Sequence, residues 1–243
     1  MIELSIISTP LRYCQEAIKI NMFYHVPIDR DVPKLLQINE NGTRFYLTPE
    51  GRKYPSVTTV LSEYSKQGIL EWRKKIGFEE ANKIANKAAT RGTKLHKLCE
   101  NYLNNQEIKF ETPIESELFT SVKPLLHNIN NIRFLEQRLY SNHLRLAGTV
   151  DCIAEYNGKI SVIDFKTSSK LKKPEYIENY FMQCSAYAVM VEELYNIPVN
   201  NLTVIIAVES EKPQVFEEKR NKWINKLIDF RDLYEKNHGF SIA

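Results

Sequence analysis

Several features that define common protein classes are missing from this chain of 243 residues. Its four cysteines are scattered and form no Cys-x-x-Cys pair, which argues against a zinc ribbon or an iron–sulfur site. No apolar run approaches the roughly 20 residues of a membrane-spanning helix. The net charge is only +3, so a nucleic-acid surface would have to come from clustered lysines and arginines.

The N-terminal residues also lack the features of common targeting peptides. No basic region is followed by a long apolar stretch, and Glu3 comes early, so a secretory signal is not expected. Glu3 and Glu16 interrupt a segment that would be poor in acidic residues in a mitochondrial presequence. We therefore expect a cytoplasmic protein of a bacterium or of a phage-infected host cell, with the mitochondrial matrix as the less favoured alternative.

The apolar pattern predicts a globular α/β protein. Hydrophobic residues make up 43% of the chain, which is ordinary for a folded domain. Periodicity predicts helices at 78–103, 114–130, 175–195 and 216–237, and strands at 133–140, 144–156, 160–166 and 201–208. A polar loop is expected at 167–170. This order favours a central mixed β-sheet flanked by helices.

The N-terminal third is predicted to be an extension, residues 1–75, that packs on a core at 76–243. Residues 35–39 and 44–47 are typical of a hairpin, and a helix follows them. Ser56 or Thr58 is expected to cap that helix. Residues 1–34 give no clear pattern.

The most informative segment is a hairpin predicted around Asn157-Gly158, a pair that favours a turn with positive φ at both positions. Asp151 lies six residues before this pair and Asp164 six residues after it, so the two carboxylates are expected to face each other. Lys166 shares a strand face with Asp164, because side chains alternate. Close carboxylates repel unless a cation lies between them, which predicts a divalent-metal site that activates water. On spacing alone, the alternative is an ordinary Asp–Lys ion pair with an unrelated acid opposite.

A histidine on the longest predicted helix is a second candidate ligand. Gly92, His96 and Glu100 recur at steps of four and share one side of the helix. The small Gly92 leaves room for a backbone or a ligand. The alternative is a helix histidine that simply bonds to a neighbour, with Glu100 as a structural partner.

Four sequence blocks in this order resemble the PD-(D/E)XK nuclease superfamily: Arg91–His96, Gly148–Asp151, Asp164–Lys166 and Gln183–Tyr187. The resemblance spans roughly residues 50–210 and is strongest to the RecB-type exonuclease branch, in which a helix histidine precedes the sheet and Gln-x-x-x-Tyr follows it. The superfamily's name expects a proline before the first acid, whereas Gly-Thr-Val precedes it here, as is common in that branch. The segment 54–61 and the later Trp-Arg pair resemble mitochondrial and phage exonucleases of this kind.

This resemblance implies a restriction-endonuclease-like fold and a Mg²⁺- or Mn²⁺-dependent DNA exonuclease. It implies that His96, Asp151, Asp164 and the carbonyl of Phe165 hold the metal, and that Lys166 orients the attacking water or stabilises the developing charge. His96, Asp151, Asp164 and Lys166 are thus the predicted catalytic residues.

Further residues are expected to support the site or contact DNA. Gln183 and Tyr187 would touch the substrate backbone or support the site, and Glu136 would act behind the ligands or bind a second cation. Predicted DNA contacts are Trp72, Arg73, Arg91, Lys94, Thr167 and Ser168. The expected partner is DNA that is single-stranded or has free ends. The alternatives are a structure-selective or restriction-like endonuclease, a non-catalytic DNA-binding module, and a phosphatase for small molecules.

Overall fold

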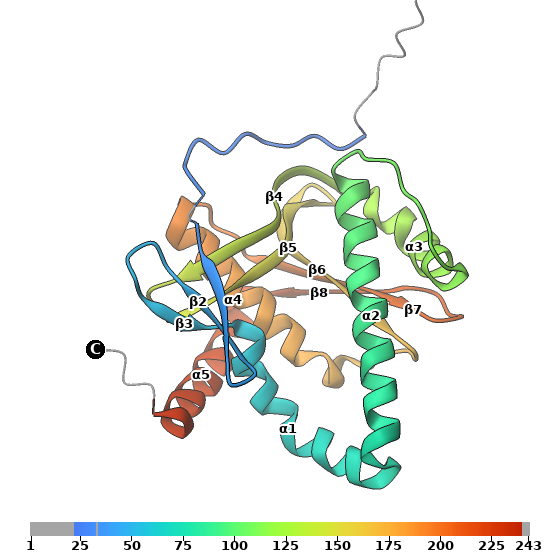
Figure 1. Ribbon diagram of the computed structural model, residues 1–243. Helices are drawn as coiled ribbons and strands as arrows, with labels where there is room; N and C mark the ends of the chain where they lie inside the picture. The colour runs from blue at the N-terminus through green and yellow to red at the C-terminus, as the bar shows by residue number, and fades with distance from the viewer. Residues whose placement is uncertain (1–21, 33, 240–243) are drawn as a thin grey trace, which may run out of the picture.

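The computed structural model describes residues 22–32 and 34–239 and confirms the predicted α/β architecture (Figure 1). Its centre is a mixed sheet in the order β4-β5-β6-β7-β8. The β6–β7 pair is parallel and the other neighbours are antiparallel. The strands are β4 (Ile129–Ser141), β5 (Leu146–Tyr156), β6 (Lys159–Ser168), β7 (Asn201–Val208) and β8 (Gln214–Lys219).

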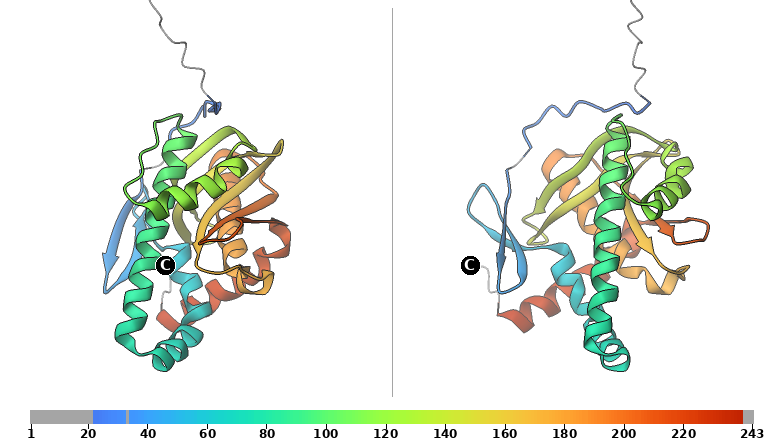
Figure 2. Two further views of the ribbon diagram at one scale, coloured as in Figure 1. Left: turned by 90° about the vertical axis from the view of Figure 1, so that its right-hand side faces the viewer. Right: turned by 45° about the vertical axis from the view of Figure 1, so that its right-hand side comes forward.

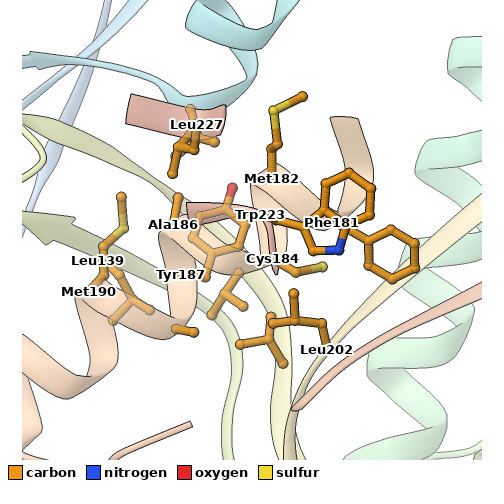
Figure 3. Close-up of a cluster of buried hydrophobic side chains, with 14 of the residues drawn as sticks. Leu139, Phe181, Met182, Cys184, Ala186, Tyr187, Met190, Leu202, Trp223 and Leu227 are labelled. Atoms are coloured by element: carbon orange, nitrogen blue, oxygen red, sulfur yellow. The ribbon is translucent and has the colours of Figure 1, made fainter. Parts of the chain in front are cut away.

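Helices cover both faces of this sheet. One face packs against α2 (Phe78–Leu103) and α3 (Pro113–Leu126). The other packs against α1 (Val57–Ile76), α4 (Glu178–Tyr195) and α5 (Ile224–His238). Neighbouring residues of β6 serve opposite faces, since Ile163 joins the first cluster and Val162 the second. Figure 3 shows the α4 side of the core, where the rings of Phe181 and Trp223 stack 5.4 Å apart.

The β5–β6 hairpin has the predicted turn. Asn157 and Gly158 have φ values of 50° and 74°, as the Asn-Gly pair requires. The strands pair in register from Tyr156–Lys159 to Cys152–Ile163. One position beyond that last pair, the same register places Asp151 opposite Asp164. The spacing argument therefore positions the two acids correctly.

A separate three-stranded sheet precedes the core, made of β1 (Leu36–Glu40), β2 (Thr43–Leu47) and β3 (Lys53–Pro55). The predicted hairpin is confirmed. Ser56 caps α1, because its Oγ accepts a hydrogen bond from the Thr59 N–H at 3.0 Å. The first turns of α1 pack into the same cluster as α4. The division at residue 75 stays a prediction, and residues 1–21 lie outside the described part of the chain.

The predicted final helix is wrong in its first part. Residues 214–219 form β8, which pairs with β7 through partners such as Phe216 and Val204. A short 3-10 turn, Arg220–Lys222, then precedes α5. Glutamate and lysine favour a helix locally, but the open edge of β7 offers a full row of backbone hydrogen bonds to an extended segment, and this tertiary pairing prevails.

Two further boundaries differ from the sequence prediction. The helix expected to run to residue 130 ends at Leu126, and Ile129 and Asn130 already pair with β5. Ile129 is buried, so its apolar surface is used by the sheet. Thr167 and Ser168, expected in a loop, extend β6 because the parallel neighbour β7 continues beside them.

The start of α3 gives a first testable prediction. Glu115 accepts hydrogen bonds from Thr112 Oγ1 (2.9 Å), the Glu111 N–H (2.9 Å) and Lys94 Nζ (2.6 Å). The Lys94 contact is the main reason why the pKa of Glu115 falls to about 2. We expect Glu115→Gln, which keeps the shape but not the charge, to lower the free energy of unfolding by about 1 kcal/mol at neutral pH.

The pH dependence of this difference follows from the sign of the shift. A carboxyl group whose pKa is lowered by folding stabilises the fold fully at pH values above its pKa in the unfolded chain. This stabilisation is lost as the pH falls toward its pKa in the folded protein. The difference in the free energy of unfolding between wild type and Glu115→Gln should therefore become smaller below pH 4.5 toward pH 2. Urea unfolding at several pH values measures it, and a gap that stays constant would contradict the charge-based explanation.

Candidate active site

The structure brings Asp151, Asp164 and Lys166 together at one end of the β5–β6 hairpin. Asp151 Oδ2 accepts a hydrogen bond of 2.8 Å from the Phe165 N–H. Lys166 Nζ donates to Asp164 Oδ1 at 2.5 Å. Both aspartates are buried, with 7% and 2% of their surface exposed. Burying two carboxylates with only one ammonium group costs free energy, which is unusual for residues with a purely structural role.

Helix α2 and strand β4 add a histidine and a third acid. His96 Nδ1 lies 3.5 Å from Asp151 Oδ1 and 3.8 Å from Glu136 Oε1. Ligand atoms of these three residues all lie within 4.8 Å of one another, so they form a group that could hold a metal ion. His96, Glu136 and Asp151 come from three different elements, and only the tertiary fold unites them.

Glu136 reaches this cluster through unusual backbone geometry. The pairs Leu135–Cys152 and Gln137–Val150 flank it, so its register position is opposite Asp151. Its φ is +48°, in the left-handed region that costs a residue with a side chain about 1–2 kcal/mol. Such strain is concentrated at functional sites, which favours a role for Glu136 as a ligand in the cluster.

Electrostatic interactions shift the pKa values of His96 and Asp151 away from their usual ranges. Burial alone would lower the pKa of His96, but the Asp151 and Glu136 carboxylates raise it to about 10. Burial would raise the pKa of Asp151, yet the His96 charge and its hydrogen bond, with Lys166, hold it below the usual value. Without a metal, the fold therefore contains an imidazolium held by two acids.

The pKa of Asp164 shifts in the opposite direction to that of Asp151. Burial raises the pKa of Asp164 to about 6, against the opposing effect of Lys166. The pKa of Lys166 is raised, since the attraction of Asp164 and Asp151 outweighs its burial. Asp164 Oδ2 is buried and has no hydrogen-bond partner among the described residues. A buried unpartnered carboxylate oxygen needs an explanation, and a bound cation would provide one.

The donor set fits a small divalent cation. Carboxylate oxygens are the preferred ligands of Mg²⁺ and Mn²⁺, and imidazole is compatible with transition ions. Of the predicted ligands, His96 and Asp151 belong to the cluster, and Glu136 joins them. Asp164 is hydrogen-bonded to Lys166 through Oδ1, and its Oδ2 has no partner among the described residues. The Phe165 N–H bonds to Asp151, and its carbonyl as a ligand stays a prediction.

Helix α4 supports the second aspartate. Gln183 Nε2 donates a hydrogen bond of 3.1 Å to Asp164 Oδ1. One turn further along the helix, Tyr187 is buried and lies among the core side chains drawn in Figure 3. A Cβ added to Gly148 would lie 2.7 Å from the Tyr187 hydroxyl oxygen. The glycine before the first acid is thus required for this close approach.

A cleft of about 340 Å³, which we call the central cleft, includes a wall from the N-terminal part of the chain. The other residues that line the cleft are His96, Glu136, Gly148, Thr149, Asp151, Lys166, Gln183 and Tyr187. The wall was missed by sequence reasoning; its residues are Arg44, Tyr46, Ser56 and Thr58. From the sequence, Ser56 and Thr58 are only candidate helix caps within the segment 54–61 that carries the family resemblance, and the sequence around Arg44 predicts only a β-strand.

A second hollow of about 540 Å³ runs along α2 and shares His96 and Glu136 with the central cleft. Gly92 also lines it. An added Cβ at Gly92 would lie 3.9 Å from Thr167 Oγ1, an ordinary contact. Packing therefore does not require glycine at this position.

The predicted DNA-contact residues are spread over several places. Arg91 forms an ion pair with Glu209, and Lys94 with Glu111 and Glu115. Both line a different hollow, between α2 and α3. Ser168 Oγ bonds to the Lys170 backbone.

Trp72 and Arg73 belong to the last turns of α1. The junction of α1 with α2 lies away from the central sheet (Figure 2). The Arg73 guanidinium lies over the Phe78 ring, 5.7 Å from its centroid. Contact of these six residues with DNA remains a prediction. No helix among the described residues is long and apolar enough to span a membrane.

Fold, acids and helix order together define a nuclease core. The family model of the PD-(D/E)XK nuclease superfamily matches residues 44–236, and the chain belongs to this superfamily. The predicted family and its restriction-endonuclease-like fold class are thereby confirmed. Members of the superfamily generally use divalent metal ions, and the His96–Glu136–Asp151 group is the candidate site here.

Individual relatives confirm the predicted similarity to a mitochondrial exonuclease. The chain is 27% identical over 202 residues to mitochondrial genome maintenance exonuclease 1 from Homo sapiens, covering 73% of this chain and 58% of the relative. The protein of that name from Mus musculus is 28% identical over 207 residues, covering 77% and 61%. The Xenopus tropicalis protein is 32% identical over 130 residues, covering 48% and 37%. The chain thus spans less than two thirds of these relatives' length.

Proposed function

We propose that this chain is a Mg²⁺- or Mn²⁺-dependent deoxyribonuclease, an exonuclease that cuts phosphodiester bonds of single-stranded DNA or DNA ends during replication, recombination or repair. The observation that carries the proposal is the arrangement of Asp151, Asp164 and Lys166 on one hairpin, with His96 and Glu136 facing them. The names of the relatives support exonuclease activity. The assignment to the RecB-type branch is part of the same proposal.

Each residue has a role that follows from its contacts. Asp151 and His96, with Glu136 or Asp164, would hold a divalent cation. When bound, the ion supplies Lewis-acid activation of water and charge neutralisation at the phosphate. Lys166 lines the central cleft and stays protonated, so it can orient the attacking water or stabilise negative charge on the phosphate oxygens. Gln183 holds Asp164 in place through its amide.

Metal binding should release a proton from His96. Its pKa of about 10 in the metal-free protein means that it is protonated at pH 8, whereas a metal ligand must be neutral. The apparent affinity for Mn²⁺ should therefore rise with pH up to about pH 10. Isothermal titration calorimetry in buffers with different ionisation enthalpies measures the released protons, and we expect about one per ion at pH 8.

The control for this measurement is His96→Gln, which should bind Mn²⁺ more weakly and without that proton release. Release of the same number of protons by His96→Gln and wild type would contradict a ligand role for His96.

The nuclease proposal is tested with end-labelled DNA, single- and double-stranded, linear and circular. Wild type and Asp164→Ala would be incubated with Mg²⁺, Mn²⁺ or EDTA. Metal-dependent loss of linear but not circular strands, abolished in the variant, is the expected result. Cutting of circles would indicate the endonuclease alternative. DNA binding without cleavage in any metal would indicate a non-catalytic binding module.

The compartment belongs to the same proposal. The sequence favours the cytoplasm of a bacterium or a phage-infected cell, whereas the relatives are named for mitochondria. The mitochondrial matrix is thus the alternative. Fluorescence microscopy of the tagged protein in its own cell distinguishes the two.

A further inference from the structure

Three hollows at the proposed active site adjoin one another. The hollow along α2 shares His96 and Glu136 with the central cleft. The central cleft also shares Arg44 and Thr58 with a third hollow of about 340 Å³, beside the start of α1 and the end of α5. The shared residues make the hollows consecutive. Arg44 and Thr58 thus lie at the border between the central cleft and the third hollow.

Arg44 has an anchored backbone and an exposed side chain. Its carbonyl accepts hydrogen bonds from the Ser56 N–H at 3.0 Å and from Thr59 Oγ1 at 3.4 Å. The side chain is exposed, and among the described residues no carboxylate forms an ion pair with it. Arg91, in contrast, is already neutralised by Glu209. An exposed guanidinium on an anchored backbone, with no ion-pair partner among the described residues, is suited to bidentate binding of a phosphate.

The neighbouring groups favour an anion at the same place. Thr58 is exposed in the first turn of α1, and its Oγ1 lies 3.0 Å from Ser56 Oγ. That turn contains no acidic residue, so the partial positive charge of the helix N-terminus is not offset. Hydroxyl groups and helix N-termini commonly contact nucleic-acid phosphates. These features add to the Arg44 guanidinium. Glu63 also lines the third hollow, and its carboxylate is paired with Lys66 and with His238.

We propose that Arg44, with the hydroxyl group of Thr58, binds a backbone phosphate of the DNA strand next to the phosphate that is cleaved. This inference rests on the proposed function and deepens it, because it assigns a phosphate-binding subsite to the N-terminal wall of the central cleft. A contact to phosphate carries no base information. The subsite therefore positions a strand of any sequence relative to Asp151 and Lys166.

The test measures binding separately from cleavage. Fluorescence anisotropy would follow a fluorescein-labelled oligothymidylate on Asp164→Ala protein in Mg²⁺, with and without Arg44→Gln. Loss of one phosphate contact should weaken binding about five- to tenfold and lower the salt-dependence slope by about 0.7. Arg44→Lys should recover part of the affinity. The matched control is Arg52→Gln, an exposed cation in the connection between β2 and β3 that lines none of the three hollows.

Chemically modified DNA identifies the contacted phosphate. Oligothymidylates with a single neutral methylphosphonate linkage, moved one position at a time, should reveal one linkage whose neutralisation weakens binding. In the Arg44→Gln protein, neutralising the same linkage should not weaken binding further, since the contact is already lost. Thermal unfolding should be unchanged, because the exposed side chain is not part of the core.

The outcomes separate the subsite from the nuclease proposal. Equal affinities and equal linkage patterns for the Arg44→Gln and parent proteins would overturn the subsite, as would an equally large effect of Arg52→Gln. Wild-type cleavage would leave the nuclease proposal standing in that case. Arg44-dependent binding to one linkage, without cleavage by wild type, would instead support the subsite and overturn the nuclease.

Discussion

Replacing Lys166 by glutamine is expected to slow DNA cleavage by about a hundred- to a thousandfold, the usual loss when one preorganised charge that stabilises a transition state is removed. Lys166 Nζ lies 2.5 Å from Asp164 Oδ1, and its side chain is only 19% exposed in the central cleft. Asp164 and the neighbouring Asp151 raise its pKa. It therefore carries a full charge at neutral pH, where glutamine would carry none.

The same substitution also alters Asp164, and the measurement must separate the two effects. Without the lysine, the buried Asp164 loses its cation, so its pKa should rise further above 6 and metal affinity should fall. Single-turnover cleavage rates should therefore be compared at saturating Mg²⁺, where reduced metal affinity no longer matters.

Lys170→Gln is the matched control for this prediction, because it removes an exposed lysine just beyond the end of β6. It should leave the rate nearly unchanged. DNA affinity should change far less than the rate in Lys166→Gln. A Lys166→Gln protein that cuts at the wild-type rate would contradict a catalytic role and favour the binding-module alternative.

Adding one methyl group at Gly148 is expected to lower the free energy of unfolding by about 1–3 kcal/mol and to reduce activity. The new Cβ of Gly148→Ala would lie 2.7 Å from the Tyr187 hydroxyl oxygen and 2.9 Å from its ring carbon Cε1. Tyr187 is buried, so its ring cannot simply swing into solvent. Relief of the clash requires movement of α4, which also carries the Gln183 contact to Asp164.

Urea unfolding and cleavage assays measure these two effects. Gly68→Ala is the matched control, since a Cβ there meets no atom within 4 Å; in mid-helix it should stabilise the protein by about 1 kcal/mol. Combining Gly148→Ala with Tyr187→Ala should cost less than the sum of the single changes, because the clash is gone. Strict additivity would show that Gly148 and Tyr187 are not coupled.

Local sequence signals identified the hairpin and the relative positions of its charged residues. An Asn-Gly turn and strand alternation placed Asp151, Asp164 and Lys166 correctly, because a two-residue turn leaves only one register for the strands beside it. Helical periodicity likewise predicted α2 and the position of His96 on it. These inferences depend on interactions within a few residues of the turn or along one helix.

Other elements depended on partners far away in the chain. The segment that became β8 has a helical composition, and its pairing with β7 overrode that preference. Glu136 was expected only to support the site or bind a second cation, and its place beside His96 follows from the β4–β5 register and a left-handed φ. A positive φ at a glutamate has no signal in the sequence.

What the sequence by itself determined is thus the α/β class, the family, and the pair of acids with their lysine. Only the tertiary structure decided that Arg44 and Thr58 join the central cleft, and that Arg91 and Lys94 are held by carboxylates elsewhere. The physical reason is that hydrogen bonds within a turn or helix are local. A cleft instead forms where separate elements pack, and its composition depends on how the whole core is arranged.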